Sequence, residues 1–438
     1  MTCLKKVLLS VALILINPAL SFGQATVKAN RKSTKEIYHV IMYGQSLMLG
    51  TQSVPVISDH QQYNSYMFKG GLRAGYDIDS NFYDALVPLV EKVSISPFSG
   101  GKLGETPASG FSEYFLNLIQ KENGFTYDSL SHRFKNWNSN LLISIPAQGS
   151  TSAKALSDDG EYWQRFKNDI YAGSKLAKAM GYSYIVPFVV WNQGERDIDL
   201  KTSPTEYKNT LIYFQSKVDS LVKKVTKQKE PVKLILYQTS SHNARNAKNN
   251  PAIANAQYEL AKSEPNITMS NATYQLLYVK DNVHFNNIGS KWNGANHAIA
   301  AKRILIDHVD WRPIYVKSVT YTNSSLILKF HVPVPPLAFD TVLISNPGNY
   351  GFRIFKSNGE EIAITSVKIL DKNRIKFIIN GKLNKGDFIW YGNNGSATGA
   401  TNGARGNLRD SQGHTLLWHS GNNDIELYNW CPIFKETL

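Results

Sequence analysis

The sequence contains little cysteine: among its 438 residues, only Cys3 and Cys431 are cysteines. Cys3 stands before a short apolar run, in a segment that we expect to be removed. Cys431 would then be alone, and the mature chain could form no internal disulfide. Its stability must therefore come from a hydrophobic core. A chain of this length with 42% hydrophobic residues can build one across two or three domains.

Metal-binding and phosphate-binding patterns are also missing. The 10 histidines show no H-x-x-x-H pair and no His/Cys cluster with the spacing of metal ligands. The glycine patterns that cradle phosphate groups are absent as well. We therefore predict that the protein uses no metal and no cofactor, so that a hydrolytic reaction would need only water as cosubstrate.

A long apolar run is lacking at the N-terminus, where the run at residues 7–16 is short and polar sequence follows it. Two lysines precede this run, and the small residues Ser21 and Gly23 offer a cleavage site after it. These features are typical of a cleaved secretory signal rather than a retained anchor. We predict a signal peptide at residues 1–23, a linker at 24–35, and an exported protein, periplasmic or extracellular, without a membrane segment after signal removal.

The chain is basic, with a formal net charge of +14. Such a charge can favour an acidic polymer or an anionic surface. The cationic residues are nevertheless spread along the chain, without a long basic run or an aromatic-basic repeat. We therefore expect a basic solvated surface and no nucleic-acid partner.

Strand-like and helical patterns alternate between residues 36 and 310. Apolar runs that are continuous enough to be buried on both faces lie at residues 37–43, 141–146, 184–191 and 233–238. Helical patterns lie between and after them, at residues 111–121, 162–180, 204–225, 251–263 and 291–308. This alternation predicts an α/β domain with a parallel sheet covered on both sides, whose ligand would sit beyond the carboxyl ends of the strands.

The pattern changes after Trp311, and we predict a small all-β, sandwich-like domain over residues 311–438. Short alternating runs punctuated by turn residues lie at 324–330, 341–345, 352–355, 362–370, 374–379 and 388–391. The stretch 393–406 is rich in Gly, Ala and Asn and predicts a long loop. This domain either binds polysaccharide or braces the first domain.

Ser46 and the distant pair Asp281 and His284 could form a catalytic triad. Ser46 follows the first predicted strand, with Gly44 allowing tight backbone geometry before it. A serine hydroxyl becomes a good nucleophile when a histidine takes its proton and a carboxylate orients that histidine. Asp281 and His284 are three residues apart, so on one turn both side chains can point the same way. Ser46 would be the nucleophile, His284 the base and Asp281 the orienting acid.

These residues lie in blocks that resemble those of the SGNH hydrolases. The blocks are Gly44-Gln45-Ser46, Trp191-Asn192-Gln193-Gly194-Glu195 and Asp281-Asn282-Val283-His284. More narrowly, they are similar to carbohydrate esterases of the sialate O-acetylesterase type, over residues 36–308. The resemblance implies a flavodoxin-like three-layer fold, and it gives Ser46, His284 and Asp281 the same roles as above.

The resemblance also implies an oxyanion hole, which needs donors aimed at the developing negative charge. The N–H of Ser46 is one candidate, and Gly149 N–H, directly after the run at 141–146, is the second. The third is the side-chain amide of Gln193. Asn192 stands beside it, but alternation along a strand sends the two side chains opposite ways, so we expect only one to face the oxyanion hole.

Further residues are predicted to support the site or to contact substrate. Gln45 belongs to the block that contains Ser46. Glu195 either holds the Gln193 loop by hydrogen bonds or is a solvated acid. Glu105 either caps a helix or contacts the loop of Ser46. Tyr43, Trp191 and His242 lie near strand ends, where flat rings could stack on a pyranose. We place these three residues, together with Asn192, among the substrate contacts.

One residue departs from the resemblance: Leu47 stands where the related esterases usually have an asparagine after the serine. Leucine can pack but cannot brace the loop by hydrogen bonds. The departure bears on substrate and subfamily rather than on the serine chemistry.

The sequence thus predicts a secreted serine esterase that removes acetyl or another small acyl group from an acetylated oligo- or polysaccharide. A lipid or aryl-ester hydrolase with the same triad is an alternative, because the fold does not fix the substrate. A carbohydrate-binding protein that has lost turnover is another alternative, which the intact Ser46, Asp281 and His284 disfavour.

Overall fold

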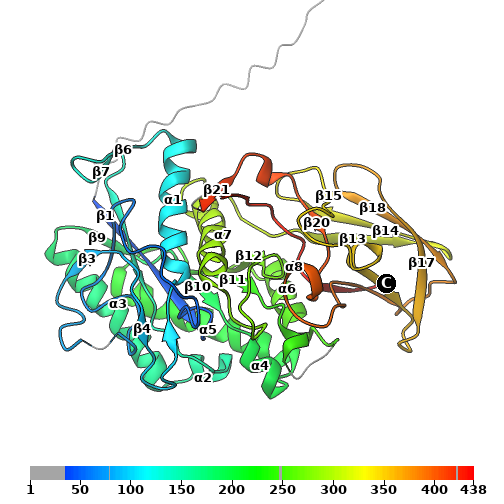
Figure 1. The fold of residues 1–438 in the computed structure, drawn as a ribbon, viewed down its shortest axis with the longest axis horizontal. Coiled ribbons are helices and arrows are strands. Elements are labelled where there is room, and N and C mark those ends of the chain that lie inside the picture. The colour runs from blue at the N-terminus through cyan, green and yellow to red at the C-terminus, as the bar shows by residue number, and fades with distance from the viewer. Residues whose placement is uncertain (1–34, 78, 246–248, 421–422) are drawn as a thin grey trace, which may run out of the picture. The chain divides into compact units, whose positions relative to one another are not determined.

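The computed structural model describes residues 35–77, 79–245, 249–420 and 423–438 (Figure 1). The predicted signal peptide lies outside the described residues, as does the predicted linker apart from Lys35. Residues 35–438 form one compact unit. Within the described part of the chain, no helix combines the length and apolar character that a membrane span requires.

An eight-stranded sheet forms the centre of the first part of the chain. Its strands are β1 (Glu36–Gly44), β2 (Ser65–Phe68), β3 (Leu86–Pro88), β8 (Ser139–Ser144), β9 (Ser183–Ile185), β10 (Phe188–Asn192), β11 (Lys233–Gln238) and β12 (Ile267–Ala272). Their order is β12-β11-β10-β1-β8-β2-β3, with β9 paired to β1. All pairings are parallel except β2 with β3. The strands β1, β8, β10 and β11 match the predicted runs, whereas β2, β3 and β12 were not predicted.

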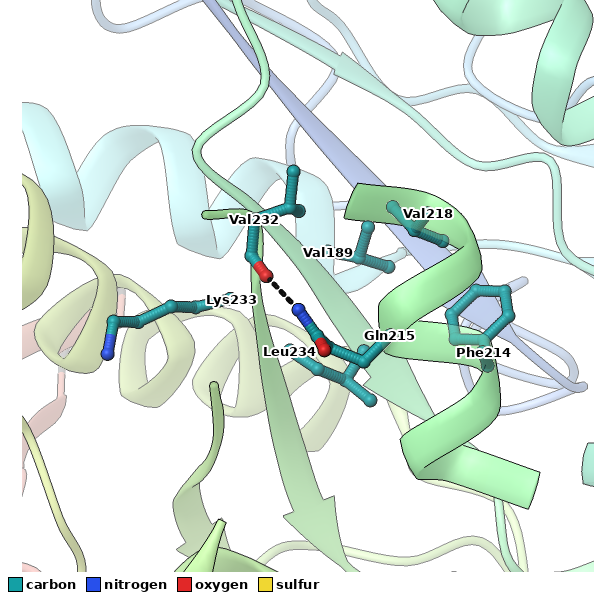
Figure 2. A pocket seen from close by; sticks show the side chains of 7 residues that line it. All are labelled: Val189, Phe214, Gln215, Val218, Val232, Lys233 and Leu234. Carbon is teal, nitrogen blue, oxygen red and sulfur yellow. Dashed lines mark hydrogen bonds between the residues drawn. The ribbon is translucent and has the colours of Figure 1, made fainter. Parts of the chain in front are cut away.

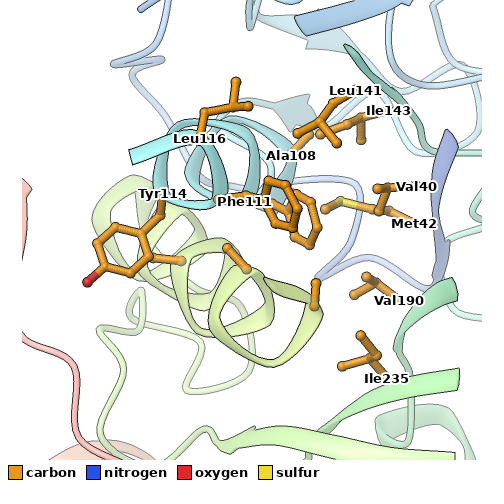
Figure 3. Packing of buried hydrophobic residues seen from close by; sticks show 14 of the residues in the cluster. Val40, Met42, Ala108, Phe111, Tyr114, Leu116, Leu141, Ile143, Val190 and Ile235 are labelled. Carbon is orange, nitrogen blue, oxygen red and sulfur yellow. The ribbon is translucent and has the colours of Figure 1, made fainter. Parts of the chain in front are cut away.

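Helices cover both faces of this sheet (Figure 1). They are α1 (Pro107–Asn123), α2 (Ala153–Ser157), α3 (Glu161–Ala179), α4 (Glu195–Leu200), α5 (Pro204–Thr226), α6 (Ala252–Ser263) and α7 (Asn287–Leu305). On one face, α1 and α7 pack on Val40, Ile143 and Val190 (Figure 3). On the other, α3 and α5 pack on Ile41 and Leu142. Neighbouring strand residues thus serve opposite faces, and for this reason the strands appear in sequence as unbroken apolar runs.

One predicted strand is divided in two. The run at 184–191 forms β9 and β10, with Val186 and Pro187 between them. Proline has no N–H to give to a sheet, so pairing stops there and resumes at Phe188.

The C-terminal part of the chain is an all-β domain, as predicted. Its seven-stranded antiparallel sheet contains β13 (Tyr315–Tyr321), β14 (Ser325–His331), β16 (Phe352–Phe355), β17 (Glu361–Ile369), β18 (Arg374–Asn380), β19 (Phe388–Tyr391) and β23 (Phe434–Thr437). The order is β13-β14-β18-β17-β16-β19-β23. Phe330 of β14 and Phe434 of β23 lie 6.3 Å apart between ring centroids, although four strands separate β14 from β23 in the sheet. The sheet therefore curls around its own core.

Short elements complete the described part of the chain. They are β4 (Ser94–Ile95), β5 (Lys102–Leu103), β6 (Thr126–Asp128), β7 (Arg133–Lys135), β15 (Ala338–Phe339), β20 (Leu408–Arg409), β21 (Leu417–Ser420), β22 (Asn423–Glu426), the helix α8 (Gly399–Asn402), and the 3-10 helices η1 (His242–Ala244), η2 (Asn349–Gly351) and η3 (Gln412–His414).

The predicted strand at 341–345 is wrong, because these residues form a turn. Asp340 Oδ1 accepts hydrogen bonds from the N–H groups of Val342 and Leu343, at 3.1 and 2.9 Å. A side chain that bonds its own following backbone in this way competes with strand pairing. The remaining cysteine of the predicted mature chain, Cys431, is buried and free.

Candidate active site

Ser46 follows β1 at the carboxyl end of the parallel sheet. Gly44 precedes it with φ of +147°, and a Cβ at Gly44 would lie 2.1 Å from the carbonyl oxygen of Asn192. Only glycine fits this close approach of β1 to β10 without strain. Gln45 is buried, and its Oε1 accepts a hydrogen bond from Arg196 N–H at 3.2 Å. Gln45 therefore ties the nucleophile segment to the start of α4, while Ser46 itself stays partly exposed.

The structure brings Ser46, His284 and Asp281 together. His284 Nε2 lies 2.8 Å from Ser46 Oγ, and His284 Nδ1 lies 2.6 Å from Asp281 Oδ2. When the Nδ1–H group donates its hydrogen bond to the carboxylate, Nε2 carries no hydrogen and can accept one from the serine hydroxyl. The His284 and Asp281 side chains keep 15% and 33% of their surface exposed. The three groups thus form one hydrogen-bonded chain within reach of solvent.

Asp281 also fixes the backbone of its own loop. Its Oδ1 accepts hydrogen bonds from the N–H groups of Val283 and His284, at 2.8 and 2.9 Å. Partial burial acts to raise the pKa of Asp281, but hydrogen bonds from the His284 ring and from these backbone groups outweigh it and hold the pKa below its usual value. The carboxylate therefore stays ionised, which is the state that orients an imidazole.

Sequence reasoning missed Gln52, which also contacts the Asp281 carboxylate. Gln52 Nε2 donates a hydrogen bond to Asp281 Oδ2 at 2.8 Å and lies 3.4 Å from His284 Nδ1. Two further bonds join the same segments: Ser53 Oγ donates to Phe285 O at 2.8 Å, and Asn287 Nδ2 donates to Pro55 O at 2.8 Å. The segment after the serine thus holds the segment that carries the histidine.

Leu47 packs in an apolar cluster that contains both chain neighbours of His284. It is 3% exposed and lies with Tyr237, Leu276, Val283 and Phe285. Val283 and Phe285 are the neighbours of His284 in the chain. Where the related esterases use a polar residue, this chain supports the histidine loop by packing.

Arg73 is a second residue that sequence reasoning missed. It is 1% exposed, and its Nε donates to the carbonyl oxygen of Leu49 at 3.0 Å. Its guanidinium also donates to Gly104 O and lies 3.4 Å from Glu91. Arg73 thus ties the turn after Ser46 to the segment that leads into α1.

The predicted oxyanion donors differ in whether their N–H groups already have a hydrogen-bond acceptor. Ser46 N–H has no acceptor among the described residues. Gly149 N–H donates to the hydroxyl of Tyr76 at 2.9 Å, a partner that the sequence did not predict. Tyr76 is 4% exposed, and its O–H donates to no acceptor within the described residues. The Tyr76 hydroxyl and Gly149 thus form one unit.

The expectation that the Gln193 amide faces the oxyanion hole is corrected. Gln193 is fully buried, and its Nε2 donates to Thr151 O at 3.2 Å and to Asp197 Oδ2 at 2.5 Å. Asp197 also accepts from Ala153 N–H at 2.8 Å. The carboxylate competes successfully for the amide hydrogens, so Gln193 joins β10 to the segment before α2.

Glu195 and Glu105 hold neighbouring loops together by hydrogen bonds. Glu195 is 1% exposed and accepts hydrogen bonds from the hydroxyl groups of Tyr237 and Thr239, each at 2.6 Å, which joins the loop after β10 to the end of β11. Glu105 accepts from Ile57 N–H at 2.8 Å and from the Ser109 hydroxyl at 2.5 Å. Its carboxylate therefore supports the entry to α1 and the loop after the serine.

Tyr43 and Trp191 were predicted to contact substrate, and the structure corrects this. Both rings are fully buried beneath helices. Tyr43 stacks on Phe214 with ring centroids 5.6 Å apart, and its hydroxyl donates to Leu156 O at 3.0 Å. Because the sheet is covered on both faces, aromatic residues at its strand ends point into the core and offer no surface to a sugar.

Asn192 and His242 are corrected in the same way. Asn192 is fully buried, with its Oδ1 2.9 Å from His297 Nε2. His242 is 1% exposed in η1, and burial lowers its pKa to about 4, so the ring is neutral. Neither side chain reaches solvent.

A niche beneath α5 is packed core rather than a site. Figure 2 shows its lining residues, among which Gln215 Nε2 donates to Val232 O at 2.8 Å. It has no room for a water molecule, and it lies at the start of β11 rather than at the carboxyl end of the sheet.

Comparisons with known proteins bear on the fold. No protein-family model and no curated protein matches the sequence. Among solved structures, the chain is similar to a carbohydrate acetylesterase from Xanthomonas citri, with a TM-score of 0.55 and 11% identity over 91% of this chain and 80% of that one. A protein from Arabidopsis thaliana gives a TM-score of 0.42 and 17% identity over 61% and 97%. A carbohydrate acetylesterase from Sinorhizobium meliloti gives 0.32 and 11% over 60% and 97%.

At such identities, likeness to a solved structure concerns the fold and not the reaction. The Xanthomonas citri protein extends the likeness over both the α/β and the all-β parts of the chain. The resemblance drawn from the sequence blocks is thereby confirmed for the architecture. The chain has an SGNH-like α/β fold with a central, mostly parallel sheet, followed by an all-β domain.

Proposed function

We propose that the chain is an exported serine esterase that removes an O-acetyl or other small acyl group from a carbohydrate. The observation that carries this proposal is the hydrogen-bonded chain from Ser46 through His284 to Asp281, with spacings of 2.8 and 2.6 Å. Nucleophile, base and orienting acid are in reach of one another at the carboxyl end of the sheet, where such folds bind their ligands. Export rests on the N-terminal sequence.

In the proposed reaction, Ser46 Oγ attacks the ester carbonyl carbon while its proton passes to His284 Nε2. Asp281 accepts the Nδ1 hydrogen bond and stabilises the imidazolium that forms. The tetrahedral intermediate then expels the sugar hydroxyl oxygen, which takes the proton from His284. Water attacks the acyl-enzyme with His284 as base, and the release of acetate restores Ser46.

In the tetrahedral intermediate, the oxyanion would accept hydrogen bonds from the N–H of Ser46 and from the hydroxyl of Tyr76, whose oxygen is held by Gly149 N–H. The Ser46 N–H is free among the described residues, and the Tyr76 O–H has a hydrogen to donate while its oxygen accepts from Gly149. Burial raises the pKa of Tyr76, so the phenol stays protonated at neutral pH. Each well-aimed donor contributes about 3 kcal/mol to lowering the barrier.

An acylated carbohydrate is proposed as the substrate because two lines agree. The sequence blocks are similar to those of carbohydrate esterases, and the Xanthomonas citri protein of similar fold is named as a carbohydrate acetylesterase. A lipid or aryl-ester hydrolase remains the alternative within the same chemistry.

The test is acetate release by the purified mature protein from acetylated glycans and from an aryl acetate, beside Ser46→Ala. We expect Ser46→Ala to lower kcat by about 10³-fold or more. Ser216→Ala is the matched control, because Ser216 is exposed on α5 and should leave the rate unchanged. Hydrolysis of long-chain esters in preference to acetylated glycans would favour the lipid alternative. Equal glycan binding by both proteins without any release would leave a binding module.

A further inference from the structure

An open pocket of about 470 Å³ is lined by both chain neighbours of Tyr76, the residue that accepts the hydrogen bond from Gly149 N–H. It is formed by the loop between β2 and β3, by Phe98, and by one side of α3. The residues with the most bearing on ligand binding are Phe82, Tyr83, Phe98, Gln164, Arg165 and Asn168. Its size is that of a ligand site rather than a packing defect.

Two contacts connect this pocket, called here the Phe98 pocket, to the residues around the serine. The Tyr76 ring meets the Phe98 ring edge-on, with centroids 5.1 Å apart, while the Tyr76 hydroxyl accepts from Gly149 N–H. Arg165 Nη1 donates to the carbonyl oxygen of Ala147 and to Gln148 Oε1, both at 3.1 Å. The walls of the pocket thus hold the segment that ends at Gly149. Tyr76 therefore contacts both the Phe98 ring of this pocket and Gly149, one of the proposed oxyanion donors.

We propose that the Phe98 pocket binds a neutral sugar residue next to the acylated one. The proposal rests on the proposed function, which it extends from an acyl group to a glycan chain. Phe98 keeps 59% of its surface exposed, so its ring offers apolar surface that a stacked pyranose would cover. Gln164 and Asn168 are exposed on one side of α3, and their amides offer donors and acceptors to sugar hydroxyls.

The charges of the pocket favour a neutral sugar over an acidic one. Three carboxylates line it, those of Asp77, Asp79 and Glu161, against one guanidinium, that of Arg165. Glu161 pairs with Arg165 at 2.8 Å, and Asp77 lies 3.6 Å from the buried Arg73. Asp79 forms no ion pair with any residue that the structure describes. A sialate or uronate would meet net negative charge here, despite the basic character of the whole chain.

The test compares the parent protein with Phe98→Ala on three esters: an acetylated neutral oligosaccharide, an acetylated neutral monosaccharide and p-nitrophenyl acetate. We expect KM for the oligosaccharide to rise about tenfold in Phe98→Ala, as loss of a stacked ring predicts. KM for the monosaccharide and for p-nitrophenyl acetate should stay within about twofold, because neither ester reaches the pocket. Any loss of support for Tyr76 would lower kcat for all three esters alike, and KM separates the two effects. Tyr171→Ala, which removes another exposed ring from α3, should leave all three unchanged.

An unchanged oligosaccharide KM in Phe98→Ala would overturn the proposal, as would a parent protein that prefers O-acetylated sialic acid to the neutral esters. Failure of the proposed function is a separate result, seen as no Ser46-dependent hydrolysis of any ester. In that case calorimetry with the deacetylated oligosaccharide still decides: binding at least fivefold weaker in Phe98→Ala supports the pocket, and equal binding or no binding refutes it.

Discussion

Gln52 donates a hydrogen bond from its side-chain amide to Asp281 Oδ2, the same oxygen that lies 2.6 Å from His284. Gln52, six positions after Ser46, therefore restrains the Asp281 carboxylate. This contact closes a ring: serine to histidine, histidine to aspartate, and aspartate back to the loop of the serine.

Replacing Gln52 tests whether this restraint matters for catalysis. Gln52→Ala removes one hydrogen bond to a charged group, and such bonds are worth about 1.5 to 3 kcal/mol. Since Gln52 is exposed, we expect the lower end, a fall in kcat/KM of about tenfold with little change in thermal stability. Gln52→Glu should be worse, because two carboxylates would face each other. Steady-state kinetics on an aryl acetate measure both, with the exposed Gln62→Ala as control. Parent-like rates in Gln52→Glu would refute the role.

Leu47 should be necessary for both stability and activity. Leu47→Ala opens a cavity beneath Val283 and Phe285, which costs about 2 to 5 kcal/mol and loosens the loop that carries His284. Leu47→Asn, which restores the residue usual in the related esterases, should lower the unfolding temperature as well, because it buries an amide in an apolar cluster. Leu47→Met conserves volume and should cost less than about 1.5 kcal/mol. Thermal denaturation and kinetics are the measurements, and a Leu47→Asn protein as stable as the parent would contradict this account.

The proximity of Ser46, His284 and Asp281 could be predicted from sequence because these residues lie in short blocks next to strand ends, and parallel strands bring their carboxyl ends to one edge. The longer helices α1, α3, α5, α6 and α7 were predicted for a similar reason, since their patterns are local, whereas the short helices α2 and α4 were not. Gln52, Arg73 and Tyr76 were not, because each acts through a loop whose path depends on packing across the whole sheet. The prediction that Tyr43 and Trp191 contact substrate was wrong, because a position at a strand end does not reveal how deeply the covering helices bury a ring.

Gln193 was misjudged for an electrostatic reason. Alternation correctly indicates that Asn192 and Gln193 point different ways, but it does not reveal which partner a buried amide will choose. Asp197, four residues further on, accepts a hydrogen bond from the side-chain amide of Gln193 and so anchors that side chain. A buried carboxylate is a stronger acceptor than a neutral group, and the sequence spacing of these two residues was the signal that could have shown it.

Buried Asp169 should make stability depend on pH. Burial raises the pKa of Asp169 to about 7, against hydrogen bonds from Ser144 and Tyr83 that lower it. An unfolded aspartate titrates near 3.9, so between about pH 4 and pH 7 the native state holds a proton that the unfolded state has released. The free energy of unfolding from this group therefore falls as the pH rises through that window, by at most about 4 kcal/mol.

Asp169→Asn isolates this contribution. Asparagine stays neutral and can still accept from the Tyr83 hydroxyl, which donates to Asp169 Oδ1 at 2.6 Å. The difference in unfolding temperature, variant minus parent, should therefore increase from pH 4 to pH 8. Glu91 and Asp410, whose pKa values burial raises to about 8 and about 6, are present in both proteins and cancel in the difference. The exposed Asp84→Asn is the control, and a difference that does not vary with pH would disprove the assignment.

Tyr76→Phe separates two roles for the hydroxyl that meets Gly149. If the phenol donates its free hydrogen to the oxyanion, its loss removes one transition-state donor, and kcat should fall about 10- to 100-fold with KM nearly unchanged. If the hydroxyl only occupies Gly149 N–H, its loss frees that donor, and kcat should rise. We expect the fall, because the buried hydroxyl donates to no other acceptor within the described residues. Thermal denaturation of the variant controls for lost packing, since the phenylalanine ring keeps the edge contact with Phe98.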